Sequence, residues 1–97
     1  MRRTGEIRKR LRVKSREAEE EIAELVESCK KELEIAGVYG DEEDPVYFQA
    51  LVLYCKSHFG YDEGTERFLQ AFKSLRDSMA LSGDYKKEGA TKWKQQY

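Results

Sequence analysis

A segment that is apolar on nearly every side constrains the fold of this chain most strongly. From Pro45 to His58 it reads Pro-Val-Tyr-Phe-Gln-Ala-Leu-Val-Leu-Tyr-Cys-Lys-Ser-His, with Lys56 as its one lysine or arginine. Asp44 and Pro45 form a typical helix start, because proline at the first helical position loses no hydrogen bond. A helix with apolar residues on all faces has to be covered on all sides. We therefore expect this helix to be central, wrapped by the rest of the chain or by neighbouring copies.

Further helices are predicted on both sides of this segment. Residues 4–13 form a short helix candidate. Ser15 is a suitable N-cap for a second helix, which runs to Gly37, a residue type common just beyond a helix end. Asp62 is a suitable N-cap for a fourth helix, which ends at Gly83. The sequence therefore predicts an all-α fold, a small bundle of about four helices.

Apolar residues recur at the spacing of a helical turn on one face of each flanking helix. The second helix carries such a stripe from Ile22 to Leu33, and the fourth carries one from Phe68 to Met79 that includes Ala71. These stripes are expected to face the central helix. The predicted core comprises Phe48, Leu51, Val52, Cys55, Phe59, Phe68, Phe72 and Leu75.

The chain beyond Asp84 has a different composition, with little helical periodicity and four lysines interleaved with aromatic residues. We therefore expect a helical domain over residues 1–84 and a flexible C-terminal arm over residues 85–97. Trp93 and Tyr97 are candidate anchors, since exposed aromatic side chains are frequent hot spots of protein interfaces. A terminal tail without a role is the alternative.

Charge is strongly segregated although the net charge is only −1. Residues 1–16 carry eight basic residues and one acidic residue, whereas residues 17–44 carry two basic and twelve acidic residues. Such asymmetry predicts complementary contacts, within the chain or between copies. The alternative is an acidic, solvated helix flanked by basic ends. The candidate residues for contacts between copies are Arg8, Arg10, Arg12, Glu20, Glu24 and Glu27.

The basic N-terminus also allows a second function, because lysine and arginine can neutralise nucleic-acid phosphates. No recognisable reading element accompanies these residues, so any DNA contact is expected to be non-specific. A small DNA-binding or DNA-packaging accessory protein is therefore one alternative. A regulatory helical module that binds one protein partner is another.

Two cysteines and the lack of a signal sequence are typical of a reducing compartment. Cys29 and Cys55 are expected to be free, half-buried thiols. No segment approaches the roughly 20 apolar residues that a membrane-spanning helix needs. We therefore expect no contact with a membrane.

Few residues could support catalysis. His58 is the single histidine, has no nucleophile motif beside it and is expected to cap its helix or to lie in an interface. Cys55 and His58 share a helix face and could reach one metal ion, but a structural zinc site needs four nitrogen or sulfur ligands, and Cys29 would supply only a third. We therefore expect a protein that is not an enzyme, without a cofactor or a metal site.

A series of residues in the second half of the chain is similar to that of a known family. The series comprises Leu-Tyr-Cys-Lys at 53–56, Phe-Gly-Tyr at 59–61, the helical face Phe68, Phe72 and Leu75, and Leu-Ser-Gly-Asp-Tyr at 81–85. It resembles the small head–tail connector, or head-completion, proteins of tailed bacteriophages. A weaker similarity extends upstream to residues 7–13, 20–25 and 35–38. The resemblance thus covers residues 6–85.

This resemblance implies a structural role in the neck of a virion, after assembly in the cytoplasm of the bacterial host. Such connectors form a ring, commonly a dodecamer, beneath the portal protein, and a stopper or tail-completion protein docks on the other side. DNA passes through the lumen of the ring. Arg8, Arg10 and Arg12 are then expected to face either this channel or Glu20, Glu24 and Glu27 of a neighbouring subunit. On this interpretation the arm is the candidate portal-docking element, through Tyr85, Lys92, Trp93 and Tyr97.

Overall fold

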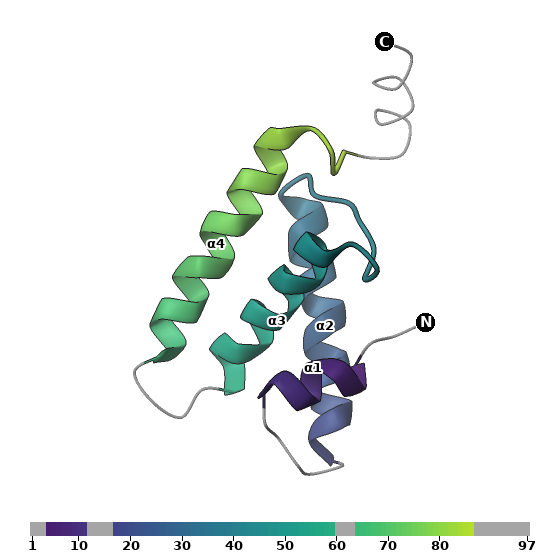
Figure 1. Cartoon of the computed structure of the whole chain (residues 1–97), viewed down its shortest axis with the longest axis vertical. Coiled ribbons are helices and arrows are strands. Elements are labelled where there is room, and N and C mark those ends of the chain that lie inside the picture. The colour runs from purple at the N-terminus through teal and green to yellow at the C-terminus, as the bar shows by residue number, and fades with distance from the viewer. Residues whose placement is uncertain (1–3, 12–16, 60–63, 87–97) are drawn as a thin grey trace.

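The computed structural model describes residues 4–11, 17–59 and 64–86, and this part of the chain is all-α, as predicted (Figure 1). Its four helices are α1 (Thr4–Leu11), α2 (Glu17–Ile35), α3 (Pro45–Phe59) and α4 (Gly64–Ser82). The predicted N-caps Ser15 and Asp62 lie outside the described residues.

The helix α3 is the centre of the bundle. It packs against α1, α2 and α4, whereas α2 and α4 make few direct contacts at most. The three long helices run in alternating directions, and α1 lies across α2 (Figure 1). Seven residues of α3 are buried, which satisfies the need of an all-round apolar helix for cover: Tyr47, Phe48, Ala50, Leu51, Val52, Tyr54 and Cys55.

The other helices contribute unequally to the core. From α2 come Ile22, Val26, Cys29 and Leu33, and α1 adds Ile7, all of them buried. From α4 only Phe72 and Met79 are buried. The buried side chains therefore come mainly from α3 and α2, although α3 also packs closely along α4.

Several predicted core positions of α4 lie nearer the surface than expected. Phe68 and Leu75 are half-buried at the edge of the core. Ala71, placed on the apolar face by its spacing, is exposed. The reason is that α4 leans on α3 alone, so a narrower stripe than its pattern allows is covered. The side chain of Phe59 lies outside the described residues.

The end of α2 is fixed by a Schellman motif, as the glycine predicted. The N–H of Val38 donates to the carbonyl of Leu33 at 2.7 Å, and the N–H of Gly37 donates to that of Glu34 at 2.9 Å. Gly37 has φ +89°, a conformation that side-chain-bearing residues rarely adopt. Val38 is buried, so the motif also turns the chain toward α3.

Helix α3 starts as predicted, with Asp44 as its N-cap. The carboxylate of Asp44 accepts a hydrogen bond from the N–H of Val46 at 2.9 Å, and Pro45 takes the first helical position. The preceding loop passes so close to Tyr47 that a Cβ on Gly40 would lie 2.6 Å from its ring. Gly40 is therefore required by packing.

We expect the substitution Gly40→Ala to cost about 1–3 kcal/mol of unfolding free energy, because the buried ring of Tyr47 has to move. Gly5→Ala is the matched control. No atom lies within 4 Å of the position that a methyl group on Gly5 of α1 would take, so alanine there should be neutral or stabilise by up to about 1 kcal/mol. Urea denaturation followed by circular dichroism measures both. Equal effects at the two positions would contradict the packing assignment.

Candidate functional site

The basic helix α1 is paired with acidic residues of its own chain. The Nε of Arg8 lies 3.0 Å from a carboxylate oxygen of Glu19 on α2. Arg10 lies 4.0 Å from Glu6, one turn away, and its guanidinium lies 5.4 Å from the ring centre of Phe48. The opposite charges of residues 1–16 and 17–44 therefore attract one another within the molecule. Arg12, the third candidate, lies outside the described residues.

The acidic candidates on α2 are in different situations. Glu27 pairs with Lys30 at 3.8 Å, and the same ammonium binds Glu42 at 2.5 Å. Glu42 is 7% exposed, so Lys30 neutralises a buried carboxylate. Glu20 and Glu24 are exposed and have no ionic partner in the part of the chain that the structure describes. Both therefore remain candidates for a contact with another subunit.

Tyr54 joins the three long helices at one point. Its hydroxyl donates a hydrogen bond to Glu32 of α2 at 2.7 Å. Its ring packs edge-on against Phe72 of α4, with the ring centroids 5.1 Å apart, and lies tilted against the ring of His58, with the centroids 4.6 Å apart. Burial, followed by the hydrogen bond to Glu32, raises the pKa of Tyr54 well above its ordinary value. The hydroxyl therefore stays protonated and serves as a donor.

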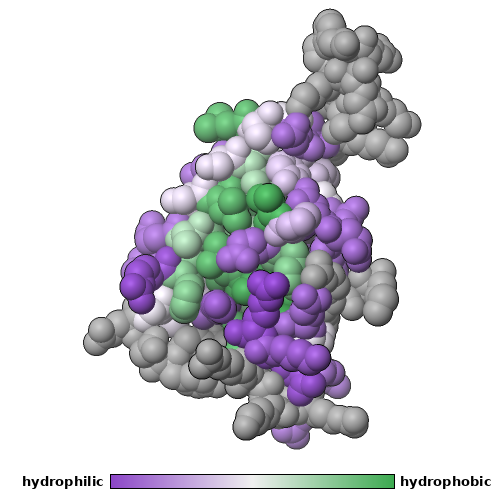
Figure 2. Space-filling model, in the orientation of Figure 1, coloured by the Kyte–Doolittle hydropathy of each residue, from purple (hydrophilic) through white to green (hydrophobic). Residues whose placement is uncertain are grey.

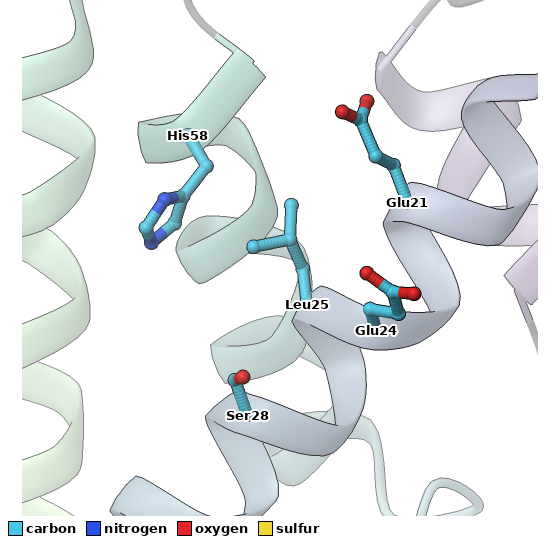
Figure 3. A pocket seen from close by; sticks show the side chains of 5 residues that line it. All are labelled: Glu21, Glu24, Leu25, Ser28 and His58. Carbon is cyan, nitrogen blue, oxygen red and sulfur yellow. The ribbon is translucent and has the colours of Figure 1, made fainter.

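A hollow of about 360 Å³ opens beside this junction, where α2 passes the end of α3 (Figure 3). In Figure 3, Leu25 and His58 approach each other across the seam between the two helices, and Glu21 and Glu24 lie on the outer side of Leu25. Two carboxylates around a leucine and an imidazole suit a basic or aromatic side chain of a partner. The described lining comprises Glu21, Glu24, Leu25, Ser28 and His58.

The sequence does not predict this hollow. Spacing places Leu25 in the apolar stripe of its helix, and the position of His58 indicates a cap or an interface residue without naming what it meets. The two residues are far apart in the chain, and only the crossing of α2 and α3 brings them together. The one indication of the hollow in the sequence is that His58 lies at the end of a helix that other segments have to cover.

The thiols of Cys29 and Cys55 are fully buried, which corrects the expectation of half-buried positions. Burial raises the pKa of Cys29 well above its ordinary value and that of Cys55 to about 12. Within the described ranges, no group of three histidine, cysteine, aspartate or glutamate residues could hold a metal ion. Cys55 therefore acts as a core residue here, while His58 is exposed.

Tyr85 belongs to the helical domain rather than to a free arm. It packs against the core, and its carbonyl accepts a hydrogen bond from the N–H of Tyr39 at 2.5 Å. Burial and a hydrogen bond to Asp44 raise the pKa of Tyr85 to about 12. The domain therefore includes Tyr85, beyond the predicted boundary at Asp84. The other docking candidates, Lys92, Trp93 and Tyr97, lie outside the described residues.

One end of the bundle carries the exposed large hydrophobic residues of the described chain. Ile35 is 80% exposed, Val46 43% and Leu81 87%. This is the end where α2 stops, α3 starts and α4 stops (Figure 1). Residues 87–97 follow from the same end. Three helices thus offer apolar side chains where the C-terminal segment begins.

Comparison with known proteins found no relative of this chain. No protein-family model matches the chain, and no curated protein and no solved structure was found to be similar. None of the described helices is long and apolar enough to cross a membrane.

The buried thiols predict a pH dependence of stability. Because the pKa of Cys55 is raised from the ordinary value of 9.0 to about 12 in the folded state, its stabilising contribution is complete below about pH 9 and is lost as the pH rises toward 12. We expect the unfolding free energy to fall above pH 9, and to fall less steeply in Cys55→Ala. Urea denaturation at a series of pH values measures this slope. An unchanged slope in the variant would contradict the assignment.

Proposed function

We propose that this chain is a head–tail connector of a tailed bacteriophage, a structural protein that forms a ring beneath the portal, extends the DNA channel and joins the head to the tail. The observation that carries the proposal is the resemblance to connector proteins in residues 53–56 and 59–61, the face of α4 and residues 81–85. Where the structure describes them, these segments fall in the second half of α3, the packed face of α4 and the turn at Tyr85. The resemblance therefore concerns one helical pair.

Uncovered apolar surface supports an assembling protein. Figure 2 shows hydrophobic side chains exposed in the middle of the face that carries α3 and α4, with hydrophilic side chains around them. Half-buried apolar residues of these helices include Leu53, Phe68 and Leu75. Apolar surface of this kind, rimmed by polar residues, is typical of protein contact sites. A subunit of a ring needs such surface on its sides.

The charge distribution supports a head-to-tail ring. In such a ring each subunit presents two different patches that complement each other. Glu20 and Glu24 form an exposed acidic surface on α2, and the N-terminal residues around Arg12 are the basic candidates. Arg8 contacts Glu19 and Arg10 contacts Glu6 within the chain. Arg12 is the residue proposed to meet a neighbour's carboxylates.

We expect the chain to bind the portal protein of the same genome and to form a ring on it, visible by electron microscopy and by native mass spectrometry. A chain that ends at Lys86 should keep its helical circular dichroism, because Tyr85 remains in place, but should lose portal binding. Trp93→Ala should weaken binding roughly 30-fold or more if Trp93 is an interface hot spot.

Gln95→Ala is the matched control in the same arm and should bind normally. Full portal binding by the chain that ends at Lys86 would show that the arm is not the anchor. Steeply salt-dependent DNA binding without any portal binding would favour the DNA-packaging alternative, since release of counterions dominates such contacts.

A charge reversal tests the lateral contact. Glu24→Lys should prevent ring formation on the portal, and Arg12→Glu in the same chain should restore it, because the pair is then reversed rather than broken. Glu34→Lys is the control, since Glu34 is also exposed on α2 but is not among the proposed contact residues. Rings are counted in electron micrographs. If the Glu24→Lys variant forms normal rings, the proposed pairing of Glu24 with Arg12 is wrong.

A further inference from the structure

The hollow beside Tyr54 has a lining of which the connector proposal uses Glu24 alone. It opens between α2 and the end of α3, and the lining residues that the structure describes come from these two helices. Its volume of about 360 Å³ is at the small end of the range of roughly 300–1,000 Å³ for ligand pockets. One large side chain, with the charged residues next to it, is the size of occupant that fits.

The lining defines the chemistry of that occupant. Leu25 and His58 offer an apolar and aromatic surface, and Tyr54 packs directly behind the imidazole at 4.6 Å. Glu21 and Glu24 lie three positions apart on one face of α2, both exposed and without an ionic partner among the described residues. An aromatic side chain flanked by positive charges therefore complements the site.

The C-terminal segment of the same chain has this composition. Residues 87–97 carry three lysines and one glutamate, and Trp93, the single tryptophan of the protein, stands between Lys92 and Lys94. No other part of the chain places an aromatic residue between two lysines. Charge complementarity and the shape of the hollow thus point to one segment.

The length of the segment allows it to reach the hollow from its own domain. Lys86 follows Tyr85, whose carbonyl is hydrogen-bonded to the N–H of Tyr39, four residues beyond the end of α2 at Ile35. Leu25, in the lining of the hollow, lies ten residues before Ile35 on α2, which is about 15 Å at a rise of about 1.5 Å per residue. Seven extended residues lead from Lys86 to Trp93 and span about 23 Å. The reach of Trp93 therefore exceeds the length of helix that the segment has to pass.

We propose that residues 87–97 fold back along the side of α4 that faces α2 and seat Trp93 in the hollow lined by Glu21, Glu24, Leu25, Ser28 and His58 of the same molecule. Lys92 and Lys94 then lie next to the two carboxylates. A consequence, which rests on the proposed connector function, is that the docked segment is not available to the portal. Binding of the portal then has to displace it from the hollow.

Trp93 reports its own position, because no other tryptophan contributes to the fluorescence. In the full chain without any portal, we expect quenching of Trp93 by acrylamide to be several-fold weaker than in a synthetic peptide of residues 87–97. The weaker quenching should not depend on protein concentration, because the contact is intramolecular. The double variant Glu21→Lys, Glu24→Lys should restore the quenching seen in the peptide. Glu34→Lys, on the same helix outside the hollow, should not.

A second measurement does not depend on folding of the charge variants. The peptide of residues 87–97, added to the chain that ends at Lys86, should shift the amide resonances of Leu25, Ser28 and His58. Quenching in the full chain equal to that of the peptide would overturn the proposal. Protection that rises with concentration would overturn it in favour of the hollow of a second copy. Both readouts are independent of portal binding, so the fold-back and the connector function can fail separately.

Discussion

The burial of α3 is the constraint on which the rest of the structure depends. Its residues are apolar around the whole circumference, and a single neighbouring helix can cover only one side of it. The chain meets this demand with three helices from both directions of the sequence, α1 and α2 before it and α4 after it. The cover is still incomplete, because α2 and α4 do not close on each other. The remaining openings are the places where partners are proposed to bind.

Several charged side chains of this molecule form ion pairs within the chain. Arg8 meets Glu19, and Lys30 meets the buried Glu42, so part of the large charge separation along the sequence is used to hold α1 and the loop before α3 onto α2. The pair of Arg8 with Glu19 is half-buried, whereas exposed pairs such as Arg10 with Glu6 contribute at most about 1 kcal/mol each. The buried carboxylate of Glu42 matters more, because an unpaired charge in that position would be costly. Carboxylates left over on α2 then give the surface its acidic character.

The C-terminal segment connects the two proposals. Tyr85 is held by Tyr39 and by the core, so residues 87–97 start from a fixed point at the end of the bundle that carries Ile35, Val46 and Leu81. From that point the segment can serve either an outside partner or the hollow beside Tyr54. A tether of this length makes the local concentration of the segment high, which favours the intramolecular contact until a partner competes.

Local signals in the sequence determined the all-α class, the start of α3 at Asp44 and Pro45, and the end of α2 at Gly37, because caps and glycine conformations depend on neighbouring residues only. The tertiary structure alone decided which apolar residues are covered. Ala71 and Phe68 have the right spacing for a core face, yet Ala71 is exposed and Phe68 is only half-buried, because α4 packs on α3 without closing on α2. It also decided that Arg8 faces Glu19 and that Leu25 meets His58, since helical periodicity gives the face of a residue but not the helix that crosses it. Which helix crosses a given face depends on the packing angles between helices, and no single segment of the sequence encodes these angles.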